Sequence, residues 1–154
     1  MHPTVSSVPE RARVLLVEES LPYRRVIREA LTSFRLCEVD DCPLAERAFE
    51  MALHCPYQLL IVAVSLPDMS GVMLDRLIAR AYPLAHPGSH TAPPVIFLTQ
   101  NKHNSELTQD QRNARRRGAV TYPPRLDILL PLTVGLLPER LPQSPLAPPS
   151  RVSR

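Results

Sequence analysis

The sequence predicts an α/β protein with a doubly wound, five-stranded parallel sheet flanked by five helices. Three short apolar runs, at 13–17, 59–64 and 95–99, are typical of strands buried on both faces of a parallel sheet. Segments with apolar residues at helical spacing lie between these runs, and such alternation indicates repeated βα units. The length of 154 residues fits one domain with a substantial core.

The remaining elements follow in order along the chain. Ser20 can cap a first helix, whose inward face is expected to carry four apolar residues: Ile27, Ala30, Leu31 and Phe34. Two weaker strands fit 36–39 and 119–122. A second helix begins at Pro43, and a third runs from Ser70 to Tyr82.

Two later segments are less regular. The proline-containing stretch 83–94 is expected to be a long exposed loop before the fourth strand. A fourth helix is predicted from Asn104 to Arg117, although it has few apolar residues beyond Leu107 and Ala114. Such a helix has little surface to bury and is marginal by itself.

Arginines are the main charge feature of this predicted fourth helix. At helical spacing Arg112, Arg115 and Arg116 share one face. These cations can complement the helix macrodipole before Gly118, or they can bind an acidic protein partner. Nucleic-acid binding is disfavoured, because no helix-turn-helix pattern or aromatic stacking platform accompanies them.

The distribution of proline suggests three parts. Eighteen prolines concentrate outside the predicted elements. Residues 1–10 are expected to form a flexible N-terminal arm, 11–137 the folded domain, and 138–154 a proline-rich disordered tail with some polyproline character.

Composition limits the class of protein. The formal net charge of +3 is too small to indicate nucleic-acid binding. No apolar run is long enough to span a bilayer, and no signal-peptide pattern opens the chain. The three cysteines lack metal-ligand spacing. We therefore expect a cytoplasmic protein with reduced thiols and no membrane partner.

Four segments, 14–20, 59–71, 94–99 and 118–126, follow one another in an order that resembles bacterial response-regulator receiver (CheY-like) domains. The resemblance spans about residues 11–137 and implies the flavodoxin-like fold of that family. It also implies a site where the carboxyl ends of the strands meet.

The resemblance implies specific roles at this site. Glu18 and Glu19 match the acidic pair that holds magnesium, and Thr99 matches the hydroxyl residue that contacts the phosphoryl oxygen. Ala63 stands where the family has the aspartate that accepts the phosphoryl group. A methyl group can neither be phosphorylated nor bind a metal, so Glu18 and Glu19 are expected to hold Mg²⁺ loosely if at all, and no cofactor is predicted.

Two residues near the fifth strand complete the comparison. Tyr122 matches the aromatic switch position of the family, and Arg125 stands at the position of a lysine that precedes a proline. Because the guanidinium fork suits a carboxylate, we expect Arg125 to form a salt bridge with Glu18 or Glu19.

These observations predict a stand-alone pseudo-receiver: a non-enzymatic, phosphorylation-independent protein-interaction module in two-component signal transduction. Its partner is expected to be a signalling protein. The predicted interface is the 99–137 surface, with Tyr122 as a fixed switch side chain. A homodimer through the same surface is a further expectation.

Two other functions remain open from the sequence. The emptied acidic crevice can serve a small-ligand or metal sensor. The chain can also be a phosphorelay protein with a non-standard acceptor, for which Ser65 is the candidate in the loop after the third strand. Asp68, in the same loop, matches a residue that accepts no phosphoryl group and is expected to be a solvated turn residue.

Overall fold

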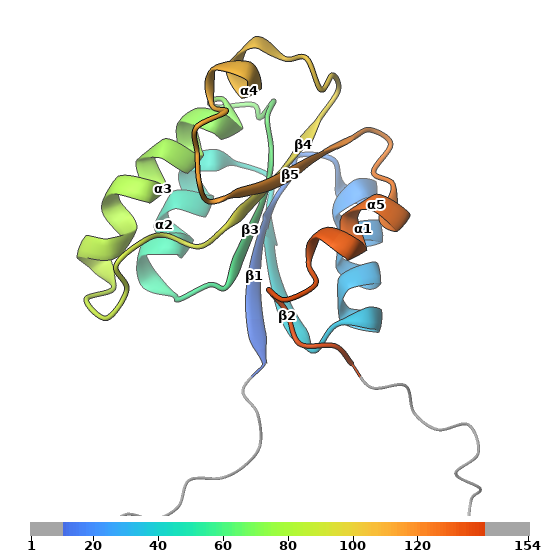
Figure 1. Cartoon of the computed structure of the whole chain (residues 1–154), viewed down its shortest axis with the longest axis horizontal. Helices are drawn as coiled ribbons and strands as arrows, with labels where there is room; N and C mark the ends of the chain where they lie inside the picture. The colour runs from blue at the N-terminus through green and yellow to red at the C-terminus, as the bar shows by residue number, and fades with distance from the viewer. Residues whose placement is uncertain (1–10, 141–154) are drawn as a thin grey trace, which may run out of the picture.

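The computed structural model describes residues 11–140 and contains five strands that alternate with five helices (Figure 1). The expectations for 1–10 and for most of the proline-rich tail concern residues outside this range. The strands are β1 (Ala12–Val17), β2 (Cys37–Cys42), β3 (Leu59–Ala63), β4 (Val95–Thr99) and β5 (Arg116–Thr121). The helices are α1 (Leu21–Phe34), α2 (Ala45–His54), α3 (Gly71–Ala85), α4 (Ser105–Gln109) and α5 (Leu126–Leu132).

The strands form one parallel sheet in the order β2-β1-β3-β4-β5. Helices α1 and α5 lie on one face and α2 and α3 on the other, while the short α4 lies near the carboxyl ends of the strands (Figure 1). This architecture confirms the predicted doubly wound α/β fold.

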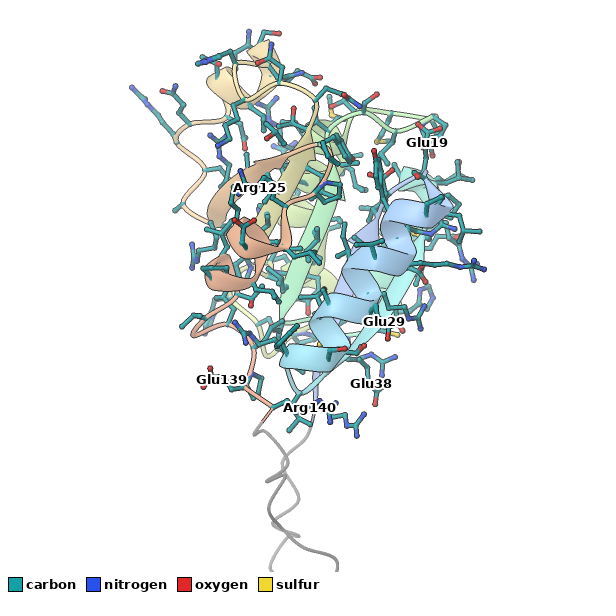
Figure 2. All side chains as sticks on the ribbon, turned by 90° about the vertical axis from the view of Figure 1, so that its right-hand side faces the viewer. Glu19, Glu29, Glu38, Arg125, Glu139 and Arg140 are labelled. Carbon is teal, nitrogen blue, oxygen red and sulfur yellow. The ribbon has the colours of Figure 1, made fainter. Side chains whose placement is uncertain are left out.

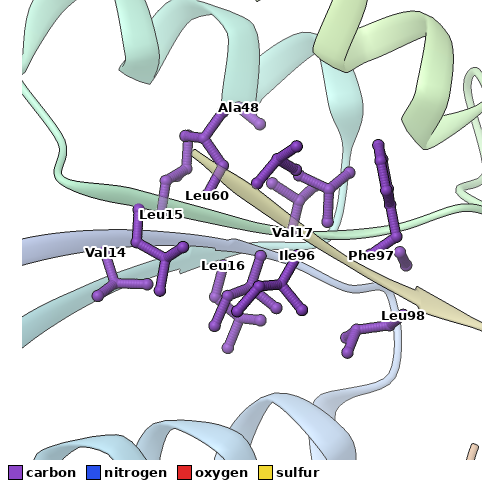
Figure 3. Packing of buried hydrophobic residues seen from close by; sticks show 14 of the residues in the cluster. Val14, Leu15, Leu16, Val17, Ala48, Leu60, Ile96, Phe97 and Leu98 are labelled. Atoms are coloured by element: carbon purple, nitrogen blue, oxygen red, sulfur yellow. The ribbon is translucent and has the colours of Figure 1, made fainter. Parts of the chain in front are cut away.

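Apolar side chains fill both faces of the sheet. Every residue of β3 and β4 is buried, because helices cover the sheet on each side. Figure 3 shows Phe97 on the side of α2 and α3, and its neighbour Leu98 on the side of α1. The buried sheet is therefore a fixed base for the residues that follow each strand.

The third helix is longer than predicted. It continues through Pro83 to Ala85, so the exposed connection begins at His86 and not at residue 83. The last turn is held by Tyr82, which is 3 % exposed and whose hydroxyl accepts a hydrogen bond from the backbone N–H of Tyr57 at 3.0 Å. Tertiary packing thus outweighs the cost of proline in the final turn.

The fourth helix is much shorter than predicted. It ends at Gln109, and the chain then turns and begins β5 at Arg116, where we had expected helix until residue 117. The physical reason is pairing: Val95 at the start of β4 lies opposite Arg116, and its N–H donates to the carbonyl of Arg115 at 2.9 Å, so the chain joins the sheet where a helix was predicted.

The end of α1 also differs from expectation. Phe34 was predicted to face inward but is 56 % exposed, because it occupies the last turn and only the seven-residue α5 lies beside it. Beyond α5 the chain returns to this end of α1. Residues 138–140, which the sequence assigned to the tail, pair with 34–36: the N–H of Leu36 donates to the carbonyl of Pro138 at 2.8 Å.

Candidate functional site

The parallel register brings three of the expected site residues, Glu18, Ala63 and Thr99, to one edge of the sheet. Val17 lies opposite Val62, so Glu18 and Ala63 each follow at the next position. Thr99 lies opposite Thr121 at the ends of β4 and β5. The carboxyl ends of four strands therefore meet here, as the fold requires of a functional crevice.

Glu18 is the centre of this edge and is 4 % exposed. One carboxylate oxygen accepts a hydrogen bond from the backbone N–H of Ser20 at 2.7 Å, because the chain turns sharply from β1 into α1. The other oxygen accepts a hydrogen bond from the hydroxyl of Tyr122. Arg24 of α1 fixes the same turn by donating to the carbonyl of Glu18 at 2.8 Å. The carboxylate is thus held by two neutral donors, one from the residue that caps α1 and one from the residue that follows β5.

Tyr122 follows β5 directly and points toward β1. Its ring stacks on Tyr23 of α1, with ring centroids 5.2 Å apart. Burial and the hydrogen bond to Glu18 both raise the pKa of the Tyr122 hydroxyl above its ordinary value, so the group stays protonated and acts as a donor. Tyr122, which the sequence predicts to be a fixed switch side chain on the 99–137 surface, is therefore half-buried against Glu18 and Tyr23.

The salt bridge expected for Arg125 does not form with either glutamate. Arg125 lies at the N-terminus of α5, and its guanidinium binds Asp127 at 2.6 Å, with both side chains more than half exposed. Glu19 is exposed on the α1 side of the molecule, away from Arg125 (Figure 2). The reason is position: Arg125 is four residues beyond the end of β5, so α5 carries it away from the edge of the sheet.

Ala63 and Thr99 are buried, at 1 % and 2 % exposure. The Thr99 hydroxyl donates to the carbonyl of Asn101 at 2.9 Å and accepts from its N–H at 3.1 Å, so it closes the turn after β4. Gly71 lies against the end of β3: a Cβ there would be 1.9 Å from the carbonyl oxygen of Ala63. The absence of a side chain at Gly71 therefore lets the start of α3 pack directly against the backbone at the end of β3.

The loop after β3 has a structural role that the sequence reasoning missed. Asp68 accepts hydrogen bonds from the backbone N–H groups of Ala45 and Glu46, each at 2.9 Å, at the N-terminus of α2. Leu44, the residue before that helix, provides no side-chain cap. The bonds from Glu46 and Ala45 hold the pKa of Asp68 below its ordinary value. Asp68 is thus a cap for α2 and not only a solvated turn residue.

A shallow groove of about 400 Å³ lies beside this loop and α4. Its lining includes the exposed Ser65 and four further polar side chains with partners inside the protein: Asp68 caps α2, Ser70 donates to Glu106 at 2.7 Å, and Asn104 caps α4. Most of the polar groups of this groove are therefore already satisfied.

Comparison with known proteins places this geometry in a fold group. No protein-family model and no curated protein sequence matches the chain. Among solved structures, a signal receiver domain of an HD domain-containing protein from Pseudomonas fluorescens is 19 % identical, with a TM-score of 0.69 over 82 % of this chain and 94 % of that one. A CheY-like receiver domain from Methylobacillus flagellatus is 17 % identical, with a TM-score of 0.67 over 82 % and 99 %. The chain has the receiver fold.

A third solved structure supports the same assignment. Chemotaxis protein CheY4 from Vibrio cholerae is 22 % identical, with a TM-score of 0.65 over 83 % of this chain and 100 % of that one. The whole of that receiver domain is therefore represented in this chain. At these identities the likeness concerns the fold.

The magnesium ion that the receiver fold implies does not fit the residues present. Residues 11–140 contain no group of three or more His, Cys, Asp or Glu side chains that could hold a metal ion. Both carboxylate oxygens of Glu18 already accept hydrogen bonds, Glu19 is exposed, and Ala63 offers no oxygen in its side chain. Mg²⁺ prefers closely placed oxygen ligands in octahedral geometry, which this set does not supply.

The arginines predicted to share a helical face are separated in the structure. Arg115 is directed inward, where its guanidinium binds Asp75 of α3 at 2.6 Å. Arg116 lies in β5 and donates to the carbonyl of Leu107 at 2.8 Å. Arg112 remains exposed in the turn before β5. A continuous basic face is therefore absent from this part of the described chain.

Asp75 could have been recognised from the sequence by its position. It falls on the inward face of α3 and is 1 % exposed. A carboxylate there requires a cation or several hydrogen-bond donors. What the sequence could not supply was the identity of the partner, because Arg115 lies in a segment predicted to be helical.

Among residues 11–140, no helix is long and apolar enough to cross a membrane.

Proposed function

We propose that this receiver-fold chain is a non-enzymatic protein-interaction module in two-component signal transduction and that it acts without phosphorylation. The observation that carries the proposal is the combination of Ala63 with a Glu18 whose two carboxylate oxygens both accept hydrogen bonds from within the protein. The methyl group has no lone pair to attack a phosphorus atom. The glutamate that would help to hold a metal is engaged by Ser20 and Tyr122 instead.

Tyr122 has a second consequence for this proposal. In the family that the chain resembles, the cation of the site is a lysine followed by proline. Arg125 is followed by Leu126, whereas Tyr122 is followed by Pro123 and its hydroxyl reaches Glu18. We infer that Tyr122 occupies the position of the lysine. Ala119, three residues earlier, then occupies the position of the aromatic switch.

With Tyr122 at the lysine position and Ala119 at the switch position, the carboxyl edge of the sheet can be fixed in one conformational state. A lysine would bring positive charge to a transferred phosphoryl group, whereas a tyrosine donates a hydrogen bond without charge. An alanine in place of the switch residue has no ring to move. The module then presents a constant surface to its partner, which we place on residues 99–137, and a second copy of the chain can use the same surface.

The direct test is labelling by acetyl phosphate with Mg²⁺, read by intact-mass spectrometry. The wild type is expected to gain no phosphoryl group. Ala63→Asp restores the nucleophile, and the double variant Ala63→Asp with Tyr122→Lys restores the cation as well, so the double variant is expected to label faster than Ala63→Asp alone. Ser65→Ala in the wild-type background is the matched control.

Each outcome decides between functions. A stoichiometric adduct on the wild type that disappears in Ser65→Ala would refute the proposal and establish a phosphorelay protein with Ser65 as acceptor. If neither variant at Ala63 is labelled, the proposed correspondence with the receiver site is wrong. Thermal unfolding with and without inorganic phosphate tests the sensor alternative at the emptied acidic crevice beside Ala63, since bound ligand would raise the melting temperature.

A further inference from the structure

An apolar groove runs between α1 and α5, on the opposite side of the sheet from α2 and α3. Its volume is about 430 Å³. The floor comprises Val26, Ala30 and Phe34, at i, i+4 and i+8 along α1, together with Leu126 of α5. Val26 is 46 % exposed and Phe34 56 %. An exposed row of this kind marks a surface that another segment can cover.

The chain itself leads toward this groove. Residues 138–140 run antiparallel to 34–36: the N–H of Leu36 donates to the carbonyl of Pro138 at 2.8 Å, and the N–H of Arg140 donates to the carbonyl of Phe34 at 3.3 Å. The side chain of Arg140 also donates to the carbonyl of Thr32 at 3.0 Å. Successive residues from 138 to 140 thus approach the last turn of α1, where Figure 2 shows Arg140 below Glu29.

The next fourteen residues, 141–154, are long enough to cover the groove. The stretch of α1 from Val26 to Phe34 is about 12 Å long at 1.5 Å per residue. A polyproline helix advances about 3.1 Å per residue, so four or five residues suffice and the segment has length to spare.

The sequence of the segment fits the chemistry of the groove. Every third residue is proline or arginine: Pro142, Pro145, Pro148, Arg151 and Arg154. A polyproline helix has three residues per turn, so this spacing puts all five along one edge. Proline-rich ligands bind grooves that contain exposed aromatic rings, and Phe34 provides such a ring. The rim of the groove carries one residue of each charge, Arg25 and Glu29, so the match depends on the apolar floor and not on charge.

We propose that residues 141–154 bind in the α1–α5 groove of the same molecule in a polyproline conformation. The occupant is intramolecular because Arg140 is already anchored beside Phe34, which gives the segment a high effective concentration at the groove. The α1–α5 face is then covered by the chain's own residues, and a partner of this face has to displace them. This proposal is independent of whether the site at Ala63 accepts a phosphoryl group.

The experiment is paramagnetic relaxation measured by NMR on the whole chain. A spin label is attached at Ser144→Cys, four residues after Arg140, in a Cys55→Ser background, since Cys37 and Cys42 are buried and burial raises the pKa of Cys42 to about 11. The amide signals of Val26, Ala30 and Phe34 are expected to broaden. Those of Met73 on α3, on the far face of the sheet, are expected to keep their intensity.

Variants and a mixed sample make the result decisive. Phe34→Ala should remove most of the broadening, whereas the matched surface variant Met73→Ala should not change it. Broadening spread evenly over α1 and α3, or none at all, would overturn the proposal. Broadening of α1 in a mixture of isotope-labelled wild type and unlabelled spin-labelled chain, equal to that within one molecule, would assign the groove to a second copy and would also overturn it.

Discussion

Glu18 and Asp75 are the two most deeply buried carboxylates of residues 11–140, and they are satisfied in different ways. Asp75 lies on α3 and binds a cation: both terminal nitrogens of Arg115 donate to it, at 2.6 and 3.1 Å, and Asn113 donates at 2.9 Å. Glu18 lies at the carboxyl edge of the sheet and binds neutral donors. No ion pair involves Glu18 within the described residues.

The difference separates a buried ion pair between segments from the carboxyl edge of the sheet, where the candidate functional site lies. Asp75 and Arg115 join α3 to the segment just before β5 through a nearly complete set of charged hydrogen bonds. Glu18 keeps its place after β1, but a tyrosine hydroxyl and a backbone N–H take up its hydrogen-bonding capacity. The edge therefore keeps an acidic residue in a form that stabilises the fold and leaves little for metal chemistry.

The largest effect is expected where the buried ion pair is broken. Asp75→Ala leaves the guanidinium of Arg115, whose side chain is 16 % exposed, without its counter-ion. Removing one partner of a buried pair costs about 3–5 kcal/mol of unfolding free energy. Urea unfolding followed by circular dichroism measures this. The double variant Asp75→Ala with Arg115→Ala should cost less than the sum of the two single variants, and strict additivity would show that the pair is not coupled.

A smaller loss is expected at Glu18. Tyr122→Phe keeps the ring on Tyr23 but removes the hydroxyl, which leaves one carboxylate oxygen of a residue that is only 4 % exposed without its partner. An unsatisfied buried acceptor costs about 1–3 kcal/mol. Tyr23→Phe is the matched control, because it changes the other ring of the stack and does not touch Glu18. Equal losses in the two variants would mean that the Tyr122 hydroxyl contributes nothing specific.

The same hydrogen bond predicts a dependence on alkaline pH. Burial and the bond to Glu18 raise the pKa of Tyr122 in the folded state above the ordinary value of 10.0. The stabilisation is therefore complete below about pH 10 and is lost as pH rises further, because the unfolded chain releases the proton first. Urea midpoints measured between pH 9 and pH 11 should fall less steeply for Tyr122→Phe than for the wild type. Parallel curves would refute the assignment.

The two sites also show what the sequence could predict. The apolar runs located the strands, and the parallel sheet then required Glu18, Ala63 and Thr99 to share an edge. The partner of Glu18 was not predicted: the family resemblance put Arg125 in that role, whereas β5 ends at Thr121 and the hydroxyl of the next residue, Tyr122, donates to the carboxylate. Which side chain after β5 reaches Glu18 depends on the turn that follows the strand, and the sequence pattern does not fix that turn.

The ion pair between Asp75 and Arg115 could not be predicted from the apolar pattern of the sequence, for a different reason. Its partner Arg115 lies 40 residues away in the chain, and the helical spacing of the arginines suggested a surface stripe. Pairing of β5 with β4 took precedence over this local helical pattern. Polar contacts between distant segments are set by the assembled fold, so periodicity along one segment does not reveal them.

Asp68 is an exposed carboxylate that accepts two hydrogen bonds, so it tests whether burial or hydrogen bonding determines how much unfolding free energy a carboxylate contributes. Asp68→Ala removes the cap of α2 and is expected to cost about 1 kcal/mol, less than either buried site. The pKa of Asp68 is lowered in the folded state, so its contribution is present above the ordinary value of 3.8 and is lost as pH falls through the lower folded value. Hydrogen exchange at the amides of Ala45 and Glu46 should become faster in Asp68→Ala. Unchanged exchange there would contradict the role as a cap.

The smallest effect is expected for Arg125→Ala. Arg125 and Asp127 form a short ion pair at 2.6 Å, but their side chains are 62 % and 64 % exposed, so water and salt compete for both charges. We expect no measurable change in the urea midpoint, and none when the measurement is repeated at high salt. Asp127→Ala is the matched control and should behave alike. A loss of stability as large as that of Tyr122→Phe would support the expectation from the sequence that Arg125 forms a salt bridge with Glu18. The distance across an ion pair is thus a poor guide to its energy, since the pairs at Arg115 and Arg125 are equally short and differ in burial.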